Sequence, residues 1–334
     1  MNEKDICLVI PTYNRSEDID RTLSTIIKNK NSFGEIIIVD QSKDSKTKDI
    51  VSRYSKYLPI KYIFSSQPSS SIAENIGVKE GKKKHKLIAI SGDDVDFLPG
   101  YTKEMVNIFN KNPKIIGVGG IDTKSMTAKP TFKNKLASIA MSLFFLPAKG
   151  INKFTITGPY GCNGSYFVDE DVKDAEWIPG FNNCFRREVY ENYSFPEIKG
   201  YNVLEDIDCS YTIYRKYGPG SLLITPRCKV VHRESPKARY PEKKRIFANH
   251  EDHFYFYYRH FNNFIGTIKM IWALFGIMLG NSLRFLVKPN KGTFSSLKYN
   301  IQGIIYSYRN RDLIKKGKLR KFLDDNLAMK KEYA

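Results

Sequence analysis

The sequence has few cysteines, and their arrangement excludes the common cysteine-based architectures. Five occur in 334 residues, an odd number, and none forms a C-x-x-C pair. A disulfide framework needs paired cysteines and a zinc site needs closely spaced ligands, so neither is expected. Cys7 lies in an apolar run, where a reduced thiol acts as a small hydrophobic side chain. This usage favours a reducing, cytoplasmic compartment.

Negative charge is also scarce, above all near the end of the chain. Lys and Arg number 54 against 35 Asp and Glu, a net charge of +19. Residues 235–334 hold 20 basic against 7 acidic residues, so +13 of the excess lies there. Such a region suits a polyanion, either nucleic acid or an anionic membrane surface. A soluble, charge-decorated surface is the alternative.

Targeting signals and a clean membrane span are lacking as well. No basic segment followed by a long apolar one opens the chain, so no signal peptide is expected. Residues 264–287 are the most apolar stretch, but Lys269 and Arg284 flank a core that contains Asn281. A spanning helix needs about 20 apolar residues. An in-plane or re-entrant helix is therefore favoured. The alternative is a buried helix pair that closes a domain.

What the sequence does contain is a repeated strand–helix pattern. Apolar runs of strand length cover residues 6–10, 35–39, 60–64, 87–90 and 115–118, with helix-like segments between them. Strands that are apolar throughout are buried on both faces, which predicts an α/β fold with a mainly parallel sheet covered by helices. Ligands in such folds bind beyond the carboxyl ends of the strands. Polar residues follow several of these strands, as this rule requires.

Other elements are predicted by local signals. Ser16 is expected to be the N-cap of the helix after the first strand, and the pattern Ser71-x-x-Glu74 is a capping box that would open the helix after the third strand. A helix is expected around residues 206–216. Short strands are expected at 221–225 and 229–231. Between 121 and 226 the periodicity is weak.

Four acidic or histidine positions carry the candidate chemistry. Asp93, Asp94 and Asp96 crowd one strand end, and carboxylates this close favour a shared cation such as Mg²⁺ or Mn²⁺. An acidic turn is the structural alternative. His232 follows a short strand and suits either a metal or a structural role.

Three further carboxylates suit either a functional or a structural role. Asp40 ends the second strand, where it suits a ribose or a base N–H, or else an Asx-turn. Glu205 and Asp206 begin a helix, where an acid suits a general base or the helix dipole.

Five motifs in order carry a family resemblance. They are VIPTYNR at 9–15, IIIVDQS at 36–42, SGDDVDFLPG at 91–100, GFNNCFRRE at 180–188 and LEDIDCSYTIYRKYG at 204–218. Together they resemble the inverting family 2 glycosyltransferases with the GT-A fold, over roughly residues 5 to 240. The resemblance implies a nucleoside diphosphate sugar donor, a divalent metal (Mn²⁺ or Mg²⁺) and transfer to an acceptor hydroxyl.

The resemblance also implies roles for matching positions. The nucleotide-sugar-binding set would be Pro11, Thr12, Tyr13, Arg15, Asp40, Asn75, Asp93, Asn182, Asn183 and Arg186. Within it, Tyr13 would lie near the base and Asp93 near the ribose, with Arg186 near the sugar or acceptor.

The remaining implied roles are metal binding and catalysis. The metal ligands would be Asp94, Asp96 and His232. Asp206 would be the catalytic base, with Glu205 beside it.

Three departures from the family pattern stand out. Gly92 replaces an acid at the first position of the metal triplet, which leaves the metal to Asp94, with or without Asp96. Glu74 precedes Asn75 where many relatives have a basic residue. The Q-x-x-R-W signature of processive synthases is absent, so transfer of a single sugar is expected.

The combined hypothesis is a metal-dependent glycosyltransferase at the cytoplasmic face of the cell membrane, peripheral or re-entrant. Residues 1–240 would form the catalytic domain, with 1–120 binding the donor and 121–240 the acceptor. Residues 241–334 would form a basic, aromatic and apolar helical extension. The acceptor would be a glycan or lipid-linked saccharide in surface glycan or polysaccharide assembly.

Two alternative functions are also considered for this sequence. A sugar-phosphate nucleotidyltransferase would need a glycine-rich basic loop after the first strand, where PTYNR stands instead. A basic nucleic-acid-binding protein would explain the charge, although the excess lies outside the motif-bearing domain.

Overall fold

The computed structural model describes residues 1–124, 132–146, 153–156, 158–160, 170–200, 204–236 and 240–324. The chain divides into two compact units. The first unit comprises Met1–Thr131, Cys162–Pro196 and Glu205–Ala238. The second unit comprises Phe132–Gly161, Glu197–Leu204 and Arg239–Ala334. Two segments that precede residue 240 therefore group with the C-terminal helices.

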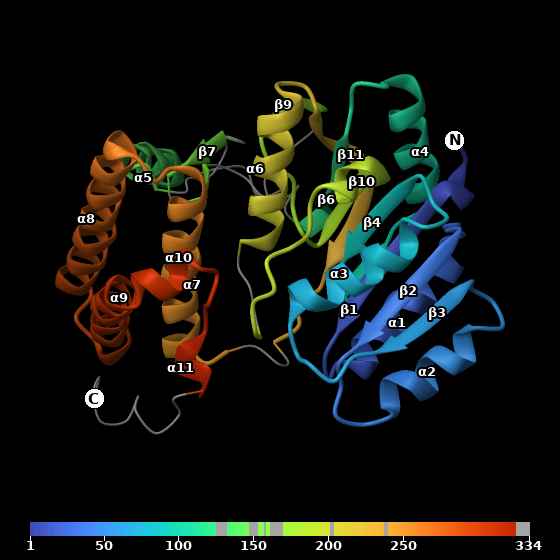
Figure 1. Ribbon diagram of the computed structural model, residues 1–334, viewed down its shortest axis with the longest axis horizontal. Helices are drawn as coiled ribbons and strands as arrows, with labels where there is room; N and C mark the ends of the chain where they lie inside the picture. Colours follow the sequence, from blue (N-terminus) through green and yellow to red (C-terminus); the bar gives the residue numbers. More distant parts are fainter. Residues whose placement is uncertain are drawn as a thin grey trace. The chain divides into compact units, whose positions relative to one another are not determined.

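The first unit is built on a nine-stranded sheet with the order β3-β2-β1-β4-β10-β6-β11-β5, and β9 pairs with β11 (Figure 1). Its strands are β1 Ile6–Thr12, β2 Glu35–Asp40, β3 Ile60–Phe64, β4 Leu87–Ser91, β5 Val95–Phe97, β6 Gly117–Asp122, β9 Val172–Ala175, β10 Asn182–Arg186 and β11 Leu222–His232. Strands β1 to β4 are parallel to one another, and β10 enters antiparallel between β4 and β6. The predicted mainly parallel sheet is confirmed.

Helices cover both faces of this sheet. On one face lie α1 Ser16–Lys28, α2 Lys46–Tyr54 and α4 Tyr101–Lys111, and on the other lie α3 Ser70–Gly81 and α6 Glu205–Tyr217. Alternate residues of β1 lie on opposite faces of the sheet. Leu8 packs in the core that includes α1, and Val9 packs in the core that includes α3. This two-sided burial explains why the strands are apolar throughout.

Helix α3 differs from its prediction at its first turn. The N-cap is Ser69, whose side chain accepts a hydrogen bond from the backbone N–H of Ile72. The expected capping box from Ser71 to Glu74 is therefore wrong, because Ser71 already lies within the helix. Gly77 lets the helix approach β1 closely, since a Cβ there would lie 2.3 Å from Cγ1 of Val9. Glu74 is thereby held on a helix that packs directly on the sheet.

The two short strands expected at 221–225 and 229–231 are one strand, β11. Its register against β6 shifts between Ile224 and Lys229. Pro226 lies in that interval and has no N–H to donate, which explains the irregularity. Cys7, Cys184, Cys209 and Cys228 are free and buried, as expected of reduced thiols, and Cys162 lies outside the described residues.

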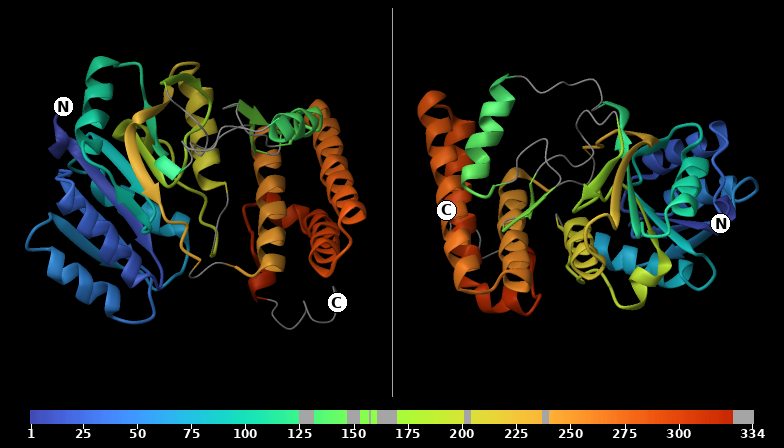
Figure 2. Two further views of the ribbon diagram at one scale, coloured as in Figure 1. Left: turned by 180° about the vertical axis from the view of Figure 1, so that it is seen from behind. Right: turned by 90° about the horizontal axis from the view of Figure 1, so that it is seen from above.

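The second unit is mainly helical in its described part. It contains α5 Phe132–Leu143, α7 Glu242–His260, α8 Phe264–Val287, α9 Lys291–Arg309, α10 Arg311–Lys315 and α11 Lys321–Asp324, with a hairpin of β7 Lys153–Thr155 and β8 Gly158–Tyr160. The end of α5 is tied to α8 (Figure 2), because the indole N–H of Trp272 donates to the carbonyl of Leu143 at 2.7 Å. The ring of Trp272 also stacks on that of Phe144.

A buried ion cluster closes this unit. The guanidinium of Arg320 is fully buried and donates to Glu251 at 2.9 Å and to both carboxylate oxygens of Asp252 at 2.7 Å. The backbone N–H of Arg320 also donates to Glu251. Two adjacent acids of α7 therefore bind the segment that follows α10.

Helix α8 is the one described helix that is long and apolar enough to cross a membrane, by length and composition alone. Only 17% of its most apolar window is buried. Phe264 and Val287 at its two ends are 80% and 85% exposed. The core of this unit therefore uses a small part of the apolar surface that the helix carries.

Candidate active site

The loops after β1 and β2 form the first part of the site. The carboxylate of Asp40 is fully buried and accepts from the backbone N–H of Ser42 and from the hydroxyl of Tyr62, each at 2.8 Å. The backbone N–H of Asn14 donates to the Ser42 hydroxyl, and the Asn14 side chain accepts from the N–H of Lys43. These bonds join the two loops at the carboxyl ends of adjacent strands. Pro11 and Tyr13, both half-buried, stand at the same end of β1.

Asp93 lies beside this pair of loops, just after β4. Its carboxylate accepts from the Thr12 hydroxyl at 2.8 Å and from the Arg15 guanidinium at 3.0 Å. Burial raises the pKa of Asp93 to about 6, against the opposing effect of the positive charge of Arg15. The structure thus brings Thr12, Arg15 and Asp93 together, as the motif order suggested.

Asp94 faces His232 across the next part of the site. Their Oδ1 and Nε2 atoms lie 3.2 Å apart, and the other oxygen of Asp94 accepts from the backbone N–H of Ser235. Burial acts to raise the pKa of Asp94, but His232 and the Ser235 N–H outweigh it and lower the pKa to about 2. The imidazole stacks on the ring of Phe181, which fixes its plane.

This pair suits a divalent cation. A carboxylate oxygen and an imidazole nitrogen at this spacing can occupy adjacent positions around one ion, and this donor set suits Mn²⁺. Asp93 turns toward Arg15 instead. Among the described residues, the group of three ligand atoms within 4.8 Å of one another is Cys7, Glu35 and His85, at the amino ends of the strands. Asp94 and His232 would therefore need oxygens from a diphosphate or water to complete a metal site.

Asp96 does not join that pair. Its carboxylate accepts from Arg21 at 2.9 Å and from Arg233, whose guanidinium also donates to the backbone carbonyl of Asp18 in α1. Two guanidinium partners leave this carboxylate poorly suited to bind a metal. The arrangement favours a structural role, in which Asp96 anchors β5 and the segment after β11 to α1.

A second acidic group surrounds the first turn of α6. Asp206 accepts from the backbone N–H groups of Gly180 and Ile207 at 2.7 and 2.8 Å. A Cβ at position 180 would lie 3.0 Å from Asp206, so glycine allows this close approach. Burial raises the pKa of Asp206 to about 6, although the N–H donors favour its charged form. The carboxylate therefore remains largely ionised at neutral pH.

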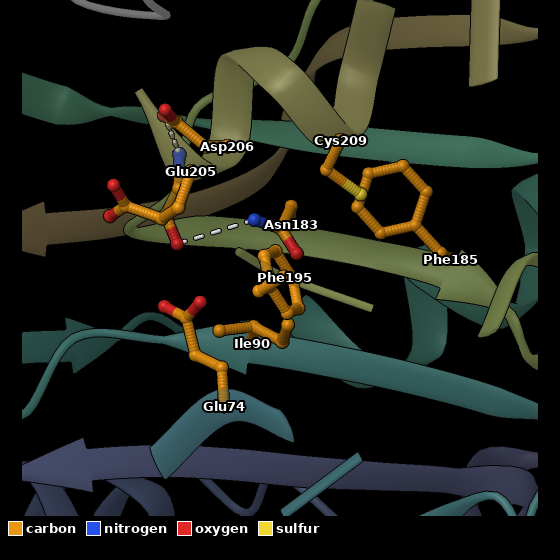
Figure 3. A pocket seen from close by; sticks show the side chains of 9 residues that line it. Glu74, Ile90, Asn183, Phe185, Phe195, Glu205, Asp206 and Cys209 are labelled. Atoms are coloured by element: carbon orange, nitrogen blue, oxygen red, sulfur yellow. Dashed lines mark hydrogen bonds between the residues drawn. The ribbon is translucent and has the colours of Figure 1, made fainter. Parts of the chain in front are cut away.

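Asp206 lies in a small pocket with two other acids. The pocket is lined by Glu74, Ile90, Gly180, Asn183, Phe185, Phe195, Glu205, Asp206 and Cys209. Figure 3 shows the carboxylate of Glu74 pointing from α3 toward Glu205 and Asp206. Burial, followed by the charge of Asp206, raises the pKa of Glu74 to about 8. Sequence reasoning missed Glu74 as a site residue, and its departure from the family pattern was the signal that could have found it.

Two contacts join the acidic groups at one edge of the sheet. The hydroxyl of Ser91, at the end of β4, donates to the backbone carbonyl of Phe181. Phe181 stacks on His232, and its neighbour Gly180 donates to Asp206. The turn before β10 thus connects the Asp94–His232 pair to the pocket around Asp206.

Two residues of the nucleotide-sugar-binding set, Arg186 and Asn75, make structural contacts. Arg186 donates to the backbone carbonyls of Ile115 and Phe109, and it pairs with Leu87 at the amino end of β4, away from the site. Asn75 exchanges two hydrogen bonds with the backbone of Phe195. The antiparallel direction of β10, which the motif could not reveal, carries Arg186 to the opposite edge of the sheet.

The two asparagines of the same motif differ from each other. Asn182 is fully buried, accepts from the hydroxyl of Tyr101 and donates to the carbonyl of Cys228. Asn183 faces the pocket, and its amide nitrogen donates to the carbonyls of Pro179 and Gly180. Asn183 is thus the asparagine placed to meet a ligand.

Comparison with known proteins agrees with this geometry. Residues 7–171 match the family model for glycosyl transferase family 2. A Methanococcus voltae dolichyl N-acetyl-alpha-D-glucosaminyl phosphate 3-beta-D-2,3-diacetamido-2,3-dideoxy-beta-D-glucuronosyltransferase is 26% identical over 58% of this chain and 65% of its own length. The Staphylococcus aureus poly(ribitol-phosphate) beta-N-acetylglucosaminyltransferase TarP is 25% identical over 36% of this chain and 38% of its own. The chain thus spans less than two thirds of these relatives.

Solved structures share the fold. Staphylococcus aureus TarS, residues 1–349 in complex with UDP-GlcNAc, superposes with a TM-score of 0.54 at 12% identity, over 95% of this chain and 87% of that one. The mannosyltransferase PcManGT of Pyrobaculum calidifontis, in complex with GDP-Man and Mn²⁺, gives 0.50 at 12% identity, over 96% and 88%. The fold is that of the GT-A glycosyltransferases. Residues 7–171 belong to glycosyl transferase family 2.

Proposed function

We propose that this protein transfers one sugar from a nucleoside diphosphate sugar to an acceptor hydroxyl, with inversion at the anomeric carbon. The observation that carries the proposal is the pocket carboxylate of Asp206, joined through Gly180, Phe181 and His232 to the Asp94 site. A base and a diphosphate site at one sheet edge are what a single displacement requires. A uridine or thymidine donor is favoured, and the relatives support the class of donor.

Asp206 would act as the general base. Its carboxylate would take the proton of the acceptor hydroxyl while the hydroxyl oxygen bonds to the anomeric carbon. The bond from that carbon to the diphosphate oxygen would break, and its electron pair would leave with the nucleoside diphosphate. Attack from the opposite face inverts the anomeric configuration. The pKa of about 6 suits this role, because a base must be ionised yet able to hold a proton near neutral pH.

Asp94 and His232 would hold a divalent ion. When bound, such an ion offsets the negative charge of the departing diphosphate. Asp93 and the buried Asp40 would then receive hydroxyl or base N–H groups of the nucleoside, beside the joined loops after β1 and β2.

A thermal-shift panel tests this function. We expect the full-length protein to gain several degrees of stability with UDP or dTDP in the presence of Mn²⁺, and less without the ion, because a ligand that binds the native state stabilises it. GDP serves as the nucleotide control and ATP as the probe for a nucleotidyltransferase. A protein that responds to none of the diphosphates would overturn the proposal.

We further propose that the second unit binds the cytoplasmic face of a membrane, where a lipid-linked saccharide would be the acceptor. The exposed apolar side chains of α8 support this, including Ile268 and Ile271, which are 53% and 63% exposed. The excess of basic residues in 235–334 suits anionic lipid headgroups. The helix would lie in the interface or re-enter, as its flanking Lys269 and Arg284 suggest.

Vesicle co-sedimentation tests the membrane proposal. We expect the protein to bind phosphatidylglycerol vesicles more tightly than phosphatidylcholine vesicles. The double variant I268E/I271E should lose more than tenfold in affinity, because each isoleucine stabilises the bound state by about 1.5–3 kcal/mol when buried. Tyr57→Glu, at a position of the first unit that is 74% exposed, is the control. Equal loss in both variants, or no vesicle binding by the wild type, would contradict the proposal.

A further inference from the structure

The pocket beside Asp206 contains hydrogen-bond acceptors that nothing in the structure satisfies. Oε2 of Glu74 and Oδ1 of Asn183 are both buried without a hydrogen-bond partner. The two residues are only 6% and 4% exposed. A ligand that donates hydrogen bonds to these oxygens would recover the cost of leaving buried acceptors unpaired. Both residues line the same pocket.

Several N–H groups around this pocket are already in use. The N–H groups of Gly180 and Ile207 donate to Asp206. The amide nitrogen of Asn183 donates to the carbonyls of Pro179 and Gly180, which also fixes which way its oxygen points. The pocket therefore offers acceptor oxygens to a ligand, while these N–H donors are already engaged. A ligand group that only donates fits this pattern best.

The charge of the pocket points the same way. Glu74, Glu205 and Asp206 line it, and no Lys, Arg or His occurs among its described lining residues. Burial and, after it, the negative charge of Asp206 raise the pKa of Glu74 to about 8. A cationic ligand would relieve the repulsion between these carboxylates.

A primary ammonium group matches these features better than a hydroxyl or a metal ion. It carries three donor hydrogens, one positive charge and no acceptor atom. A hydroxyl brings one donor hydrogen and no positive charge, so it would not offset the three acids that line the pocket. The three acids do not form one of the groups whose ligand atoms lie within 4.8 Å of one another, so they are too widely spaced to hold one metal ion in the described arrangement.

We propose that Glu74 and Asn183 form a subsite for a free amino group on the acceptor sugar. The assignment of this amine to the acceptor sugar rests on the proposed function, in which Asp206 takes the proton of the acceptor hydroxyl. The subsite itself rests on the pocket alone. Glu74 would thus be a specificity-determining residue, selecting sugars with an unacetylated amine over neutral or N-acetylated ones. Phe195 and Ile90 line the same pocket and would leave little room for an acetyl group.

The test is a ligand-observed NMR titration of the full-length protein with glucosamine, glucose and N-acetylglucosamine at pH 7. We expect glucosamine to bind at least fivefold more tightly than the other two sugars. Glu74→Gln should reduce this preference to less than twofold, while Glu74→Asp, which keeps the charge, should retain part of it. Glu80→Gln is the matched control, since Glu80 lies on the same helix and pairs with Lys61 and Lys83 outside the pocket. Glu74→Leu replaces Glu74→Gln if the latter does not fold.

The outcomes separate this inference from the proposed function. Equal binding of the three sugars, no binding of any, or a preference that survives in Glu74→Gln overturns the amine subsite. A nucleoside diphosphate response in the thermal-shift panel would leave the transferase proposal standing in that case. A Glu74-dependent amine preference without any nucleotide response would support the subsite and overturn the transferase proposal.

Discussion

Two groups of buried acids lie at the same edge of the sheet, and their surroundings give them opposite properties. Burial acts on both, but His232 and the Ser235 N–H lower the pKa of Asp94 to about 2. The pocket of Glu74 and Asp206 has no basic lining residue, and burial raises the pKa values to about 8 and about 6. Residue type alone therefore does not assign a role. A paired carboxylate suits a fixed charge, whereas an unpaired one suits proton exchange.

The largest effect is expected at the unpaired group. Asp206→Asn removes the proton acceptor but keeps the size of the side chain. We expect transfer to fall by about 10³-fold or more, with nucleotide affinity unchanged, because the lost interaction acts on the proton in the transition state. Single-turnover transfer and nucleotide titration measure the two properties separately. Turnover within tenfold of wild type would remove Asp206 from the mechanism.

The next effect separates two neighbouring acids of the paired group. Asp94→Ala should abolish the Mn²⁺-dependent part of UDP or dTDP binding, since one of the two metal ligands is lost. Asp96→Asn should keep that binding but lower the free energy of unfolding by about 3 kcal/mol, because Arg233 then loses its buried partner. Calorimetric titration and urea unfolding provide the measurements. Metal-dependent binding that disappears in Asp96→Asn would restore Asp96 as a ligand.

The smallest expected effect is the pH dependence of kcat/KM, which compares Asp206 with Asp94 in the wild-type protein. Asp206 must be ionised to accept a proton, and its pKa is raised to about 6. We expect kcat/KM to fall about tenfold per pH unit below pH 6 and to level off above pH 7. Asp94, with its lowered pKa, should keep its charge through this range. Circular dichroism at each pH controls for unfolding, and a flat profile down to pH 5 would contradict the assignment.

The parallel part of the fold was predictable because burial on both faces makes each strand an uninterrupted apolar run. Cys7 and Val9 face one core while Ile6 and Leu8 face the other, so β1 shows no alternation of polar and apolar residues. The ends of such strands then place Asp40 and Asp93 at one edge. The family motifs located Asp206 and His232 in the same way, because their order along the chain follows the fold.

Long-range pairing could not be predicted from local pattern. Nothing in residues 180–188 reveals that β10 runs antiparallel between β4 and β6, and this direction decides that Asn183 faces the pocket while Arg186 does not. Glu74 and Asp206 are 132 positions apart in the chain, and their encounter depends on α3 and α6 covering the same face. The pattern Ser71-x-x-Glu74 also predicted that Glu74 helps to cap its own helix, whereas the N-cap is Ser69.

The Arg320 cluster has a consequence for how the second unit opens. Helices α8, α9 and α10 lie in the chain between α7 and Arg320, so the ion pairs close a loop that contains all three. If the chain unfolded from its C-terminal end, Arg320 would be exposed first. Glu251 and Asp252 would then remain as buried charges without their partner. Unfolding the enclosed helices one at a time would therefore cost free energy at the first step. We therefore expect the helices from α7 to α10 to unfold together rather than by gradual fraying.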